Sequence, residues 1–319
     1  MEQAGPDLRA AHHDRVTGGR RDDVTQVRAR AGVGLLALAI AVLTPRPVAA
    51  WGYVAHRIVV ENAAPALPAP LAAFYAANLR LLSDASIEPD SLLRGREGDK
   101  EARRHYFNLD ELSRPPFRDL PFDEDEARSM FGDERLERAG HLPWRILSVL
   151  DQLRDAHRRK DWAKVVSRSG WLSHYVADSY QPLHTTRNHD GRDSCNQGVH
   201  AAFETDMIDR LKARYRLETA LPTTFVAEVI REPRRFVFGE ILGNYELVDE
   251  ILRADTAAML AVKRQRSDYY EEMEGSVGRL ARRQMSRAAA TTANLWYTAW
   301  FQGGRPDLPD KPVAREARP

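Results

Sequence analysis

The chain has 319 residues, of which 43% are hydrophobic and 29% are charged, and its formal net charge is +1. This length and composition are those of a globular protein with a substantial core, in one or two domains. A near-neutral chain argues against nucleic-acid binding through a broad basic surface. The single cysteine, Cys195, excludes an intrachain disulfide and a thiolate metal site.

The first fifty residues have the pattern of an export signal. An apolar run at 31–44 is followed by the small residues Val48 and Ala50. This pattern predicts a signal peptide at 1–50 with cleavage after Ala50, so that the mature protein is periplasmic or secreted. The apolar run is shorter than the roughly 20 residues of a spanning helix, which disfavours a retained membrane anchor.

After Trp51 the hydrophobic periodicity is helical almost throughout, and no sustained two-residue alternation indicates a sheet. We therefore expect an all-α fold, a helical bundle in one catalytic domain at 51–303, followed by a loose, proline-rich tail at 304–319. In chain order, the expected helices are 56–64, 69–82, 144–159, 162–180, 199–215, 224–231, 238–265 and 268–301.

The predicted mature chain begins with the sequence WGYVAH, which contains Trp51 and His56. Cleavage would give Trp51 a free α-amine, a group with a pKa of about 7.7 to 8.0 that can lose its proton to a metal. Farther along, Asp90 and His105 lie fifteen residues apart and would attract no notice alone.

The sequence SHYVADSYQPLH is the most informative stretch of the chain. His174 and Asp178 are four residues apart in the helix expected at 162–180, so both lie on one face. Pro182 ends that helix and allows His184 to return toward them. This geometry suits neighbouring metal ions.

The helix expected at 199–215 repeats the signal, because His200 and Glu204 are again four residues apart. Imidazole nitrogen combined with carboxylate oxygen suits zinc, at about 2.0 to 2.2 Å, whereas oxygen ligands alone suit calcium or magnesium. Zinc is therefore the expected metal. The other histidines, His12, His13, His141, His157 and His189, are expected to be structural or solvated.

Together these residues resemble the superfamily of zinc-dependent phospholipases C and fungal and plant single-strand-specific nucleases, over residues 51 to about 215. The resemblance implies three zinc ions per chain. It implies a first zinc held by Asp90, His105, His174 and Asp178, a second by His184, His200 and Glu204, and a third by the amine and carbonyl of Trp51 with His56 and the shared Asp178.

Three zinc ions and three ligand carboxylates leave about three positive charges, which would attract a phosphodiester. Zinc can lower the pKa of bound water toward about 7, and paired metals orient hydroxide for attack. Asp90 and Asp178 are the catalytic candidates because they would hold the metal that carries this water. No covalent protein nucleophile is expected.

The predicted function is therefore an exported, zinc-dependent phosphodiester hydrolase, acting as a monomer without an obligate protein partner. The spacing from Trp51 to His56 favours a single-strand nuclease, whereas the closing pair His200 and Glu204 resembles the phospholipases C and keeps head-group cleavage of phospholipids open. A third alternative is an exported zinc-binding protein without turnover. The sequence lacks the HExxH, GxSxG, GxxxxGK[ST] and GxGxxG motifs of other enzyme classes.

Overall fold

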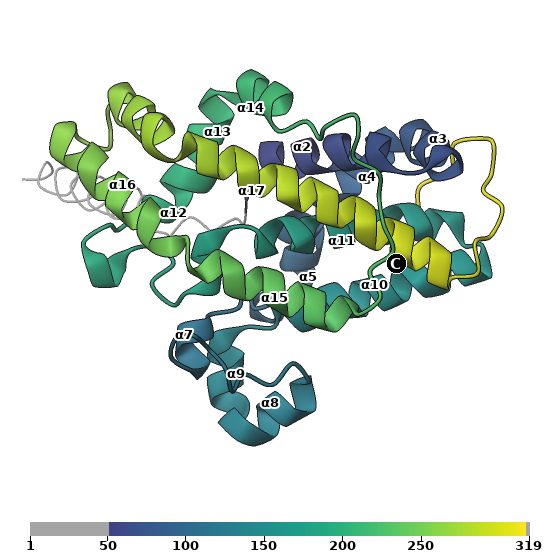
Figure 1. The fold of residues 1–319 in the computed structure, drawn as a ribbon, viewed down its shortest axis with the longest axis horizontal. Coiled ribbons are helices and arrows are strands. Elements are labelled where there is room, and N and C mark those ends of the chain that lie inside the picture. Colours follow the sequence, from purple (N-terminus) through teal and green to yellow (C-terminus); the bar gives the residue numbers. More distant parts are fainter. Residues whose placement is uncertain (1–50, 317–319) are drawn as a thin grey trace, which may run out of the picture. The chain divides into compact units, whose positions relative to one another are not determined.

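A computed structural model of the chain describes residues 51–316, and this part is built from helices with no strand (Figure 1). The predicted all-α class is thus confirmed. Among these residues, none of the helices combines the length and apolarity needed to span a bilayer. The predicted signal peptide at 1–50 lies outside the described residues.

The first half of the described part contains many short helices and two long ones. In chain order they are α2 (Tyr53–Ala63), η1 (Ala64–Ala66), α3 (Ala69–Ala77), α4 (Leu79–Ala85), the π-helical turn η2 (Pro89–Leu93), α5 (Arg94–Glu97), α6 (Asp99–Ala102), α7 (Leu109–Leu112), α8 (Glu124–Phe131), α9 (Asp133–Ala139), α10 (Leu142–Arg159) and α11 (Trp162–Ser179).

The second half ends in the longest helix. Its elements are η3 (Pro182–Thr185), η4 (Arg192–Ser194), α12 (Val199–Ala201), the π-helical turn η5 (Ala202–Asp206), α13 (Met207–Arg210), α14 (Lys212–Glu218), α15 (Pro233–Tyr245), α16 (Val248–Ala261) and α17 (Ser267–Gln302). Helix α17, coloured from light green to yellow in Figure 1, packs against α2, α10, α11 and α16.

The predicted helix at 224–231 is wrong, and the reason lies in its backbone hydrogen bonds. The amides of Glu228 and Ile230 donate to the side chains of Asn294 and Thr298 on α17, both at 2.9 Å. The amide of Ala227 donates to the carbonyl of Ala66 at 3.0 Å. These tertiary partners replace the helical carbonyls, so the segment runs along α17 without helical structure.

Three other predicted helices are interrupted. The one at 199–215 breaks at Leu211, between α13 and α14. The one at 69–82 breaks at Asn78, whose side chain donates to the carbonyl of Phe74. The one at 238–265 divides into α15 and α16 after Asn244, a buried residue whose side chain donates to the carbonyl of Ser179 at 2.7 Å. At Asn78 and at Asn244, the asparagine side chain donates a hydrogen bond to a backbone carbonyl.

A close approach of α4 and α11 fixes the position of the most informative helix. A Cβ atom on Gly170 would lie 2.4 Å from the Cβ of Ala85 and 2.8 Å from its carbonyl carbon. Only glycine therefore allows this spacing. The next residue after α4, Ser86, accepts a hydrogen bond from Nδ1 of His174 at 2.7 Å through its carbonyl.

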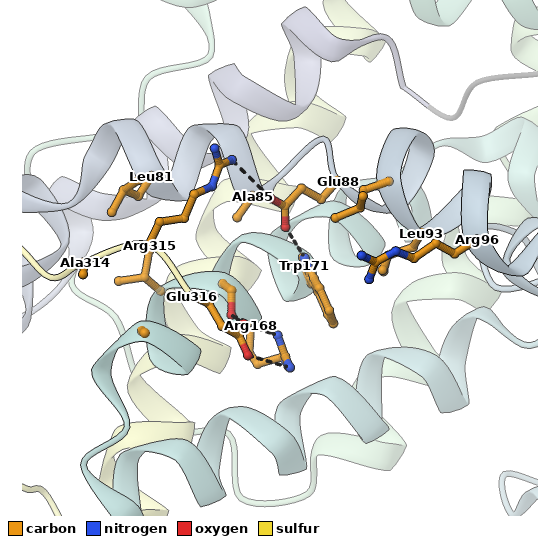
Figure 2. Close-up of a pocket in the computed structure, with 14 residues that line it drawn as sticks. Leu81, Ala85, Glu88, Leu93, Arg96, Arg168, Trp171, Ala314, Arg315 and Glu316 are labelled. Atoms are coloured by element: carbon orange, nitrogen blue, oxygen red, sulfur yellow. Dashed lines mark hydrogen bonds and ion pairs between the residues drawn. The ribbon is translucent and has the colours of Figure 1, made fainter. Parts of the chain in front are cut away.

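The C-terminal residues follow the surface of α4 and α11. The amide of Val313 donates to Asn78 at 2.9 Å, and Arg315 lies 3.3 Å from Glu88. Glu316 accepts from Arg168 at 2.9 Å, and this arginine stacks on Trp171. Figure 2 shows Arg315 with Glu88, and Arg168 with Glu316, around a pocket that none of the predicted metal ligands lines.

Replacing Gly170 by alanine should destabilise the protein by roughly 1–3 kcal/mol, because α4 must move away from α11. The change is measured as a fall in the midpoint of thermal unfolding. Gly239→Ala is the matched control, since nothing lies within 4 Å of a Cβ built there in α15. It should raise stability by about 0.5–1 kcal/mol. Equal effects of the two substitutions would contradict the packing argument.

His157 on α10 gives the protein a pH-dependent stability. It is fully buried, neither ring nitrogen has a hydrogen-bond partner, and burial lowers its pKa to about 3. A histidine in an unfolded chain has a pKa of about 6.5. The unfolded state therefore binds more protons between these values, and the stability is complete above pH 6.5 and lost as the pH falls toward 3.

We expect His157→Leu to reduce this loss. Between pH 7.5 and pH 5, metal-free wild-type protein should lose more unfolding free energy than the metal-free variant, in which no imidazole takes up the proton at this position. Chemical unfolding at the two pH values measures the difference. Parallel pH profiles for the two proteins would show that His157 carries no such linkage.

Candidate metal centre

Eight of the nine predicted ligands are brought together as side chains in three groups that can hold metal ions. The groups are His56, His174 and Asp178; Asp90, His105 and His174; and His184, His200 and Glu204. All of these side chains are buried. They come from α2, η2, the turn after α6, α11, η3, α12 and η5.

The group of His184, His200 and Glu204 has the spacing of a single-ion site. The two Nε2 atoms lie 3.0 Å apart, and Oε2 of Glu204 is 3.4 Å from His184 and 2.9 Å from His200. Ligand atoms that share a tetrahedral zinc ion at about 2.1 Å lie about 3.4 Å from one another. The three donors thus surround one point.

A second group forms around Nδ1 of His105. It lies 2.9 Å from Oδ2 of Asp178, 3.0 Å from Nε2 of His174 and 3.5 Å from Oδ1 of Asp90. Residues 69 to 73 positions apart in the chain meet here. The structure therefore joins the four residues that the resemblance placed on one metal.

Asp178 links this group to the third one. Its Oδ1 lies 3.5 Å from Nε2 of His56, whereas its Oδ2 faces His105. The ring of His56 also stacks on that of His174 with centroids 3.9 Å apart. One carboxylate could therefore contribute to two neighbouring ions, which is the role that the resemblance implies for Asp178.

Two of the predicted carboxylate ligands lie in π-helical turns. Asp90 is in η2 and Glu204 is in η5. Such turns insert one extra residue in a helix and are frequent at functional sites.

Gln181 connects two parts of the centre and was not predicted from the sequence. Its Oε1 accepts from the amide of Leu183 at 3.1 Å, which begins the turn that carries His184. Its Nε2 donates to Oε2 of Glu204 at 3.0 Å. In the sequence, Gln181 directly precedes Pro182 and lies between the two predicted ligand pairs. This position was the only indication of its role.

Several of the donor atoms have no hydrogen-bond partner in the described part of the chain. Both nitrogens of His56, both oxygens of Asp90 and Oδ1 of Asp178 are buried without a hydrogen bond. Buried polar groups without partners are costly, and carboxylates especially so. Because imidazole and carboxylate are metal ligands, these orphaned atoms fit a bound cation.

Among the five imidazoles, the pKa shifts favour the neutral form near pH 7 for His56, His174 and His184, whereas neighbouring carboxylates raise the pKa values of His105 and His200 against the effect of burial. Burial lowers the pKa of His56 to about 3 and that of His184 to about 4, and it holds the pKa of His174 well below its ordinary value. Burial also opposes ionisation of Glu204, but His200 and His184 outweigh it and lower the pKa of this carboxyl to about 2. Neutral imidazole and ionised carboxylate are the forms that bind metal.

The predicted role of Trp51 involves its main chain, so it is not one of the side-chain groups. The indole is buried and packs near Phe203, with ring centroids 5.7 Å apart. The amide of Gly52 lies 3.4 Å from the carbonyl of Glu204 and donates to it. The main chain after Trp51 thus adjoins the turn that carries a ligand, and ligation by a freed amine stays a prediction.

Comparison with known proteins gives one distant similarity. No protein-family model matches the chain. A protein of Bradyrhizobium tropiciagri named as a probable serine protease is 26% identical over 217 residues, which cover 59% of this chain and 26% of the relative. The chain thus spans about a quarter of the length of that relative.

This name contradicts the predicted phosphodiester hydrolase in both its forms, the single-strand nuclease and the phospholipase C, and it equally gives no support to a zinc-binding protein without turnover. The prediction was wrong in assigning a substrate from the ligand set, because metal ligands define how water is activated and leave the bond that is cleaved open. The coarser findings stand separately: the name of the relative is that of a hydrolase, and this chain has groups of side chains that can hold metal ions.

Removing one ligand should remove bound metal from the group it belongs to. His184→Ala leaves His200 and Glu204 with one donor fewer, so we expect less metal per chain by elemental analysis after dialysis. The thermal stabilisation by added zinc should also fall, since a ligand at 100 times its Kd stabilises by about 2.7 kcal/mol. His141→Ala, which removes a histidine paired with Glu137 outside the three groups, is the control. Equal metal content in the two variants would contradict the assignment of His184.

Proposed function

We propose that the protein is a metal-dependent hydrolase that holds a cluster of three zinc ions and uses a metal-activated water as its nucleophile. The observation that carries the proposal is the set of three buried groups, linked through His174 and Asp178, in each of which the donor atoms lie within 4.8 Å of one another. Zinc suits the mixture of imidazole and carboxylate. When bound, it would polarise the scissile group and lower the pKa of water toward about 7.

Residues of the chain would hold the metal ligands in the orientation that this reaction needs. Asp178 directs one oxygen to each of two groups and so fixes their separation. The carbonyl of Ser86 accepts from Nδ1 of His174, which leaves Nε2 free to face the site. Gln181 holds Glu204 by donating to its Oε2, the oxygen that also faces His184 and His200. Outer partners of this kind fix ring and carboxylate orientation at metal sites.

A serine nucleophile finds no support in the geometry. In serine hydrolases of the Ser-His type, the nucleophilic serine hydroxyl lies within hydrogen-bond reach of a histidine base. Within residues 51–316, no hydrogen bond joins a serine hydroxyl to a histidine ring; the contact of Ser86 with His174 uses its carbonyl. The serine-protease name of the relative therefore has no matching pair in this part of the chain.

We also propose that the scaffold is related to the zinc phospholipase C and nuclease superfamily, and that the protein is exported. The order of ligands along the chain supports the first, and the apolar run before Ala50 supports the second. Neither proposal identifies the substrate.

The test is hydrolysis of a panel of chromogenic peptides, carboxylic esters and phosphoric esters by protein beginning at Trp51. We expect turnover of at least one class, its loss with a chelator, its return with zinc, and no labelling by a serine-directed fluorophosphonate. Activity that resists the chelator and is abolished by the fluorophosphonate would contradict the proposal and establish a serine hydrolase.

Asp178→Asn should lower kcat by roughly 100-fold or more, since even outer residues of metal sites change activity 10 to 100-fold. Asp255→Asn is the matched control, because Asp255 is equally buried and is held by Arg264 and Tyr269 outside the three groups. The control should lose stability with little change in kcat. A similar fall in kcat for both would show that Asp178 acts only through the fold.

A further inference from the structure

A buried carboxylate outside the three groups faces one of their histidines. Glu101, in α6, is fully buried and stands four residues before His105. Its Oε1 lies 3.5 Å from Nε2 of His105 and accepts a hydrogen bond from the hydroxyl of Tyr175. Its Oε2 accepts from Arg104 at 2.5 Å.

The two ring nitrogens of His105 have different surroundings. Nδ1 faces Asp178, His174 and Asp90, the donors of one metal group. Nε2 is buried and makes no hydrogen bond within the described part of the chain. The carboxylate that lies opposite it is that of Glu101.

We propose that Glu101 is a positioning residue that receives the Nε2 proton of His105 and so turns its Nδ1 toward the metal. A ligating histidine commonly donates its other N–H to a carboxylate, which fixes the tautomer and ring orientation and makes the ligand nitrogen more basic. The inference rests on the proposed metal cluster, and it adds a residue that the ligand spacing does not reveal.

Tyr175 and Arg104 hold the carboxylate in place. The hydroxyl of Tyr175 also accepts from Arg145 at 3.1 Å, and its ring lies 5.4 Å from that of His105. Arg104 is shared with Glu97 at 2.8 Å. A carboxylate that is fixed from two sides by charged or hydroxyl donors can orient a third group without turning away from it.

The chain contains a matched arrangement without a histidine. Glu274 is also buried, accepts from the hydroxyl of Tyr215 at 2.5 Å and is paired with Arg282. Glu274 therefore has partners of the same types, a tyrosine and an arginine, and serves as a reference for their contribution to stability. Only Glu101 has a neighbouring histidine, His105. Comparing the two carboxylates therefore distinguishes a structural role from a positioning role.

The experiment compares Glu101→Gln with Glu274→Gln. Zinc affinity is measured by competition with a chromophoric chelator, and cobalt is substituted so that its visible absorption reports ligand geometry. We expect Glu101→Gln to bind one metal equivalent 10 to 100-fold more weakly, with an altered cobalt spectrum. Glu274→Gln should bind as the wild type does. Both should show a comparable fall in metal-free thermal stability.

If Glu101→Gln does not fold, Tyr175→Phe tests the same point. It keeps the carboxylate and removes one of its donors, and it should weaken the same metal equivalent about fivefold, the effect of one lost hydrogen bond. Unchanged affinity in the variant that folds, or an equal loss in Glu274→Gln, would overturn the inference while leaving the metal cluster intact. A wild-type protein that binds no metal would overturn the cluster and this inference together.

Discussion

The structure depends on the burial of eight side chains that interact poorly with an apolar interior. Five imidazoles and three carboxylates lie close together between helices, and several of their atoms have no partner in the described part of the chain. Carboxylates brought together in a low dielectric repel one another, and unpartnered imidazoles lose their hydration. A cation among them would supply both the missing charge and the missing ligand contacts, and metal binding would then stabilise the fold.

Helix α11 is the element around which this centre is built. It carries His174 and Asp178 on one face, and its close approach to α4 at Gly170 brings the carbonyl of Ser86 to His174. Directly after the helix, Gln181 begins the turn that returns His184 and also holds Glu204. A short stretch of sequence therefore positions ligands that belong to different groups.

The sequence predicted the parts of this arrangement that depend on local spacing. His174 with Asp178, and His200 with Glu204, are four residues apart in helical segments, and the structure places each pair as expected. Glu101 and His105 are also four residues apart, but the sequence around them does not by itself indicate a metal site. The helix predicted at 224–231 failed because its amides bond to α17, a tertiary effect that local periodicity does not contain. The prediction of the substrate was wrong for a different reason: ligand spacing indicates how metals are held and says little about the bond that is cleaved.

The most direct test of this account is anomalous X-ray scattering at the zinc absorption edge, from crystals of protein beginning at Trp51 and grown with zinc. The account predicts anomalous peaks within each of the three groups, with the density of Asp178 between two of them. Crystals in which His184, His200 and Glu204 enclose no anomalous peak, with their side chains bonded instead to one another or to water, would contradict it.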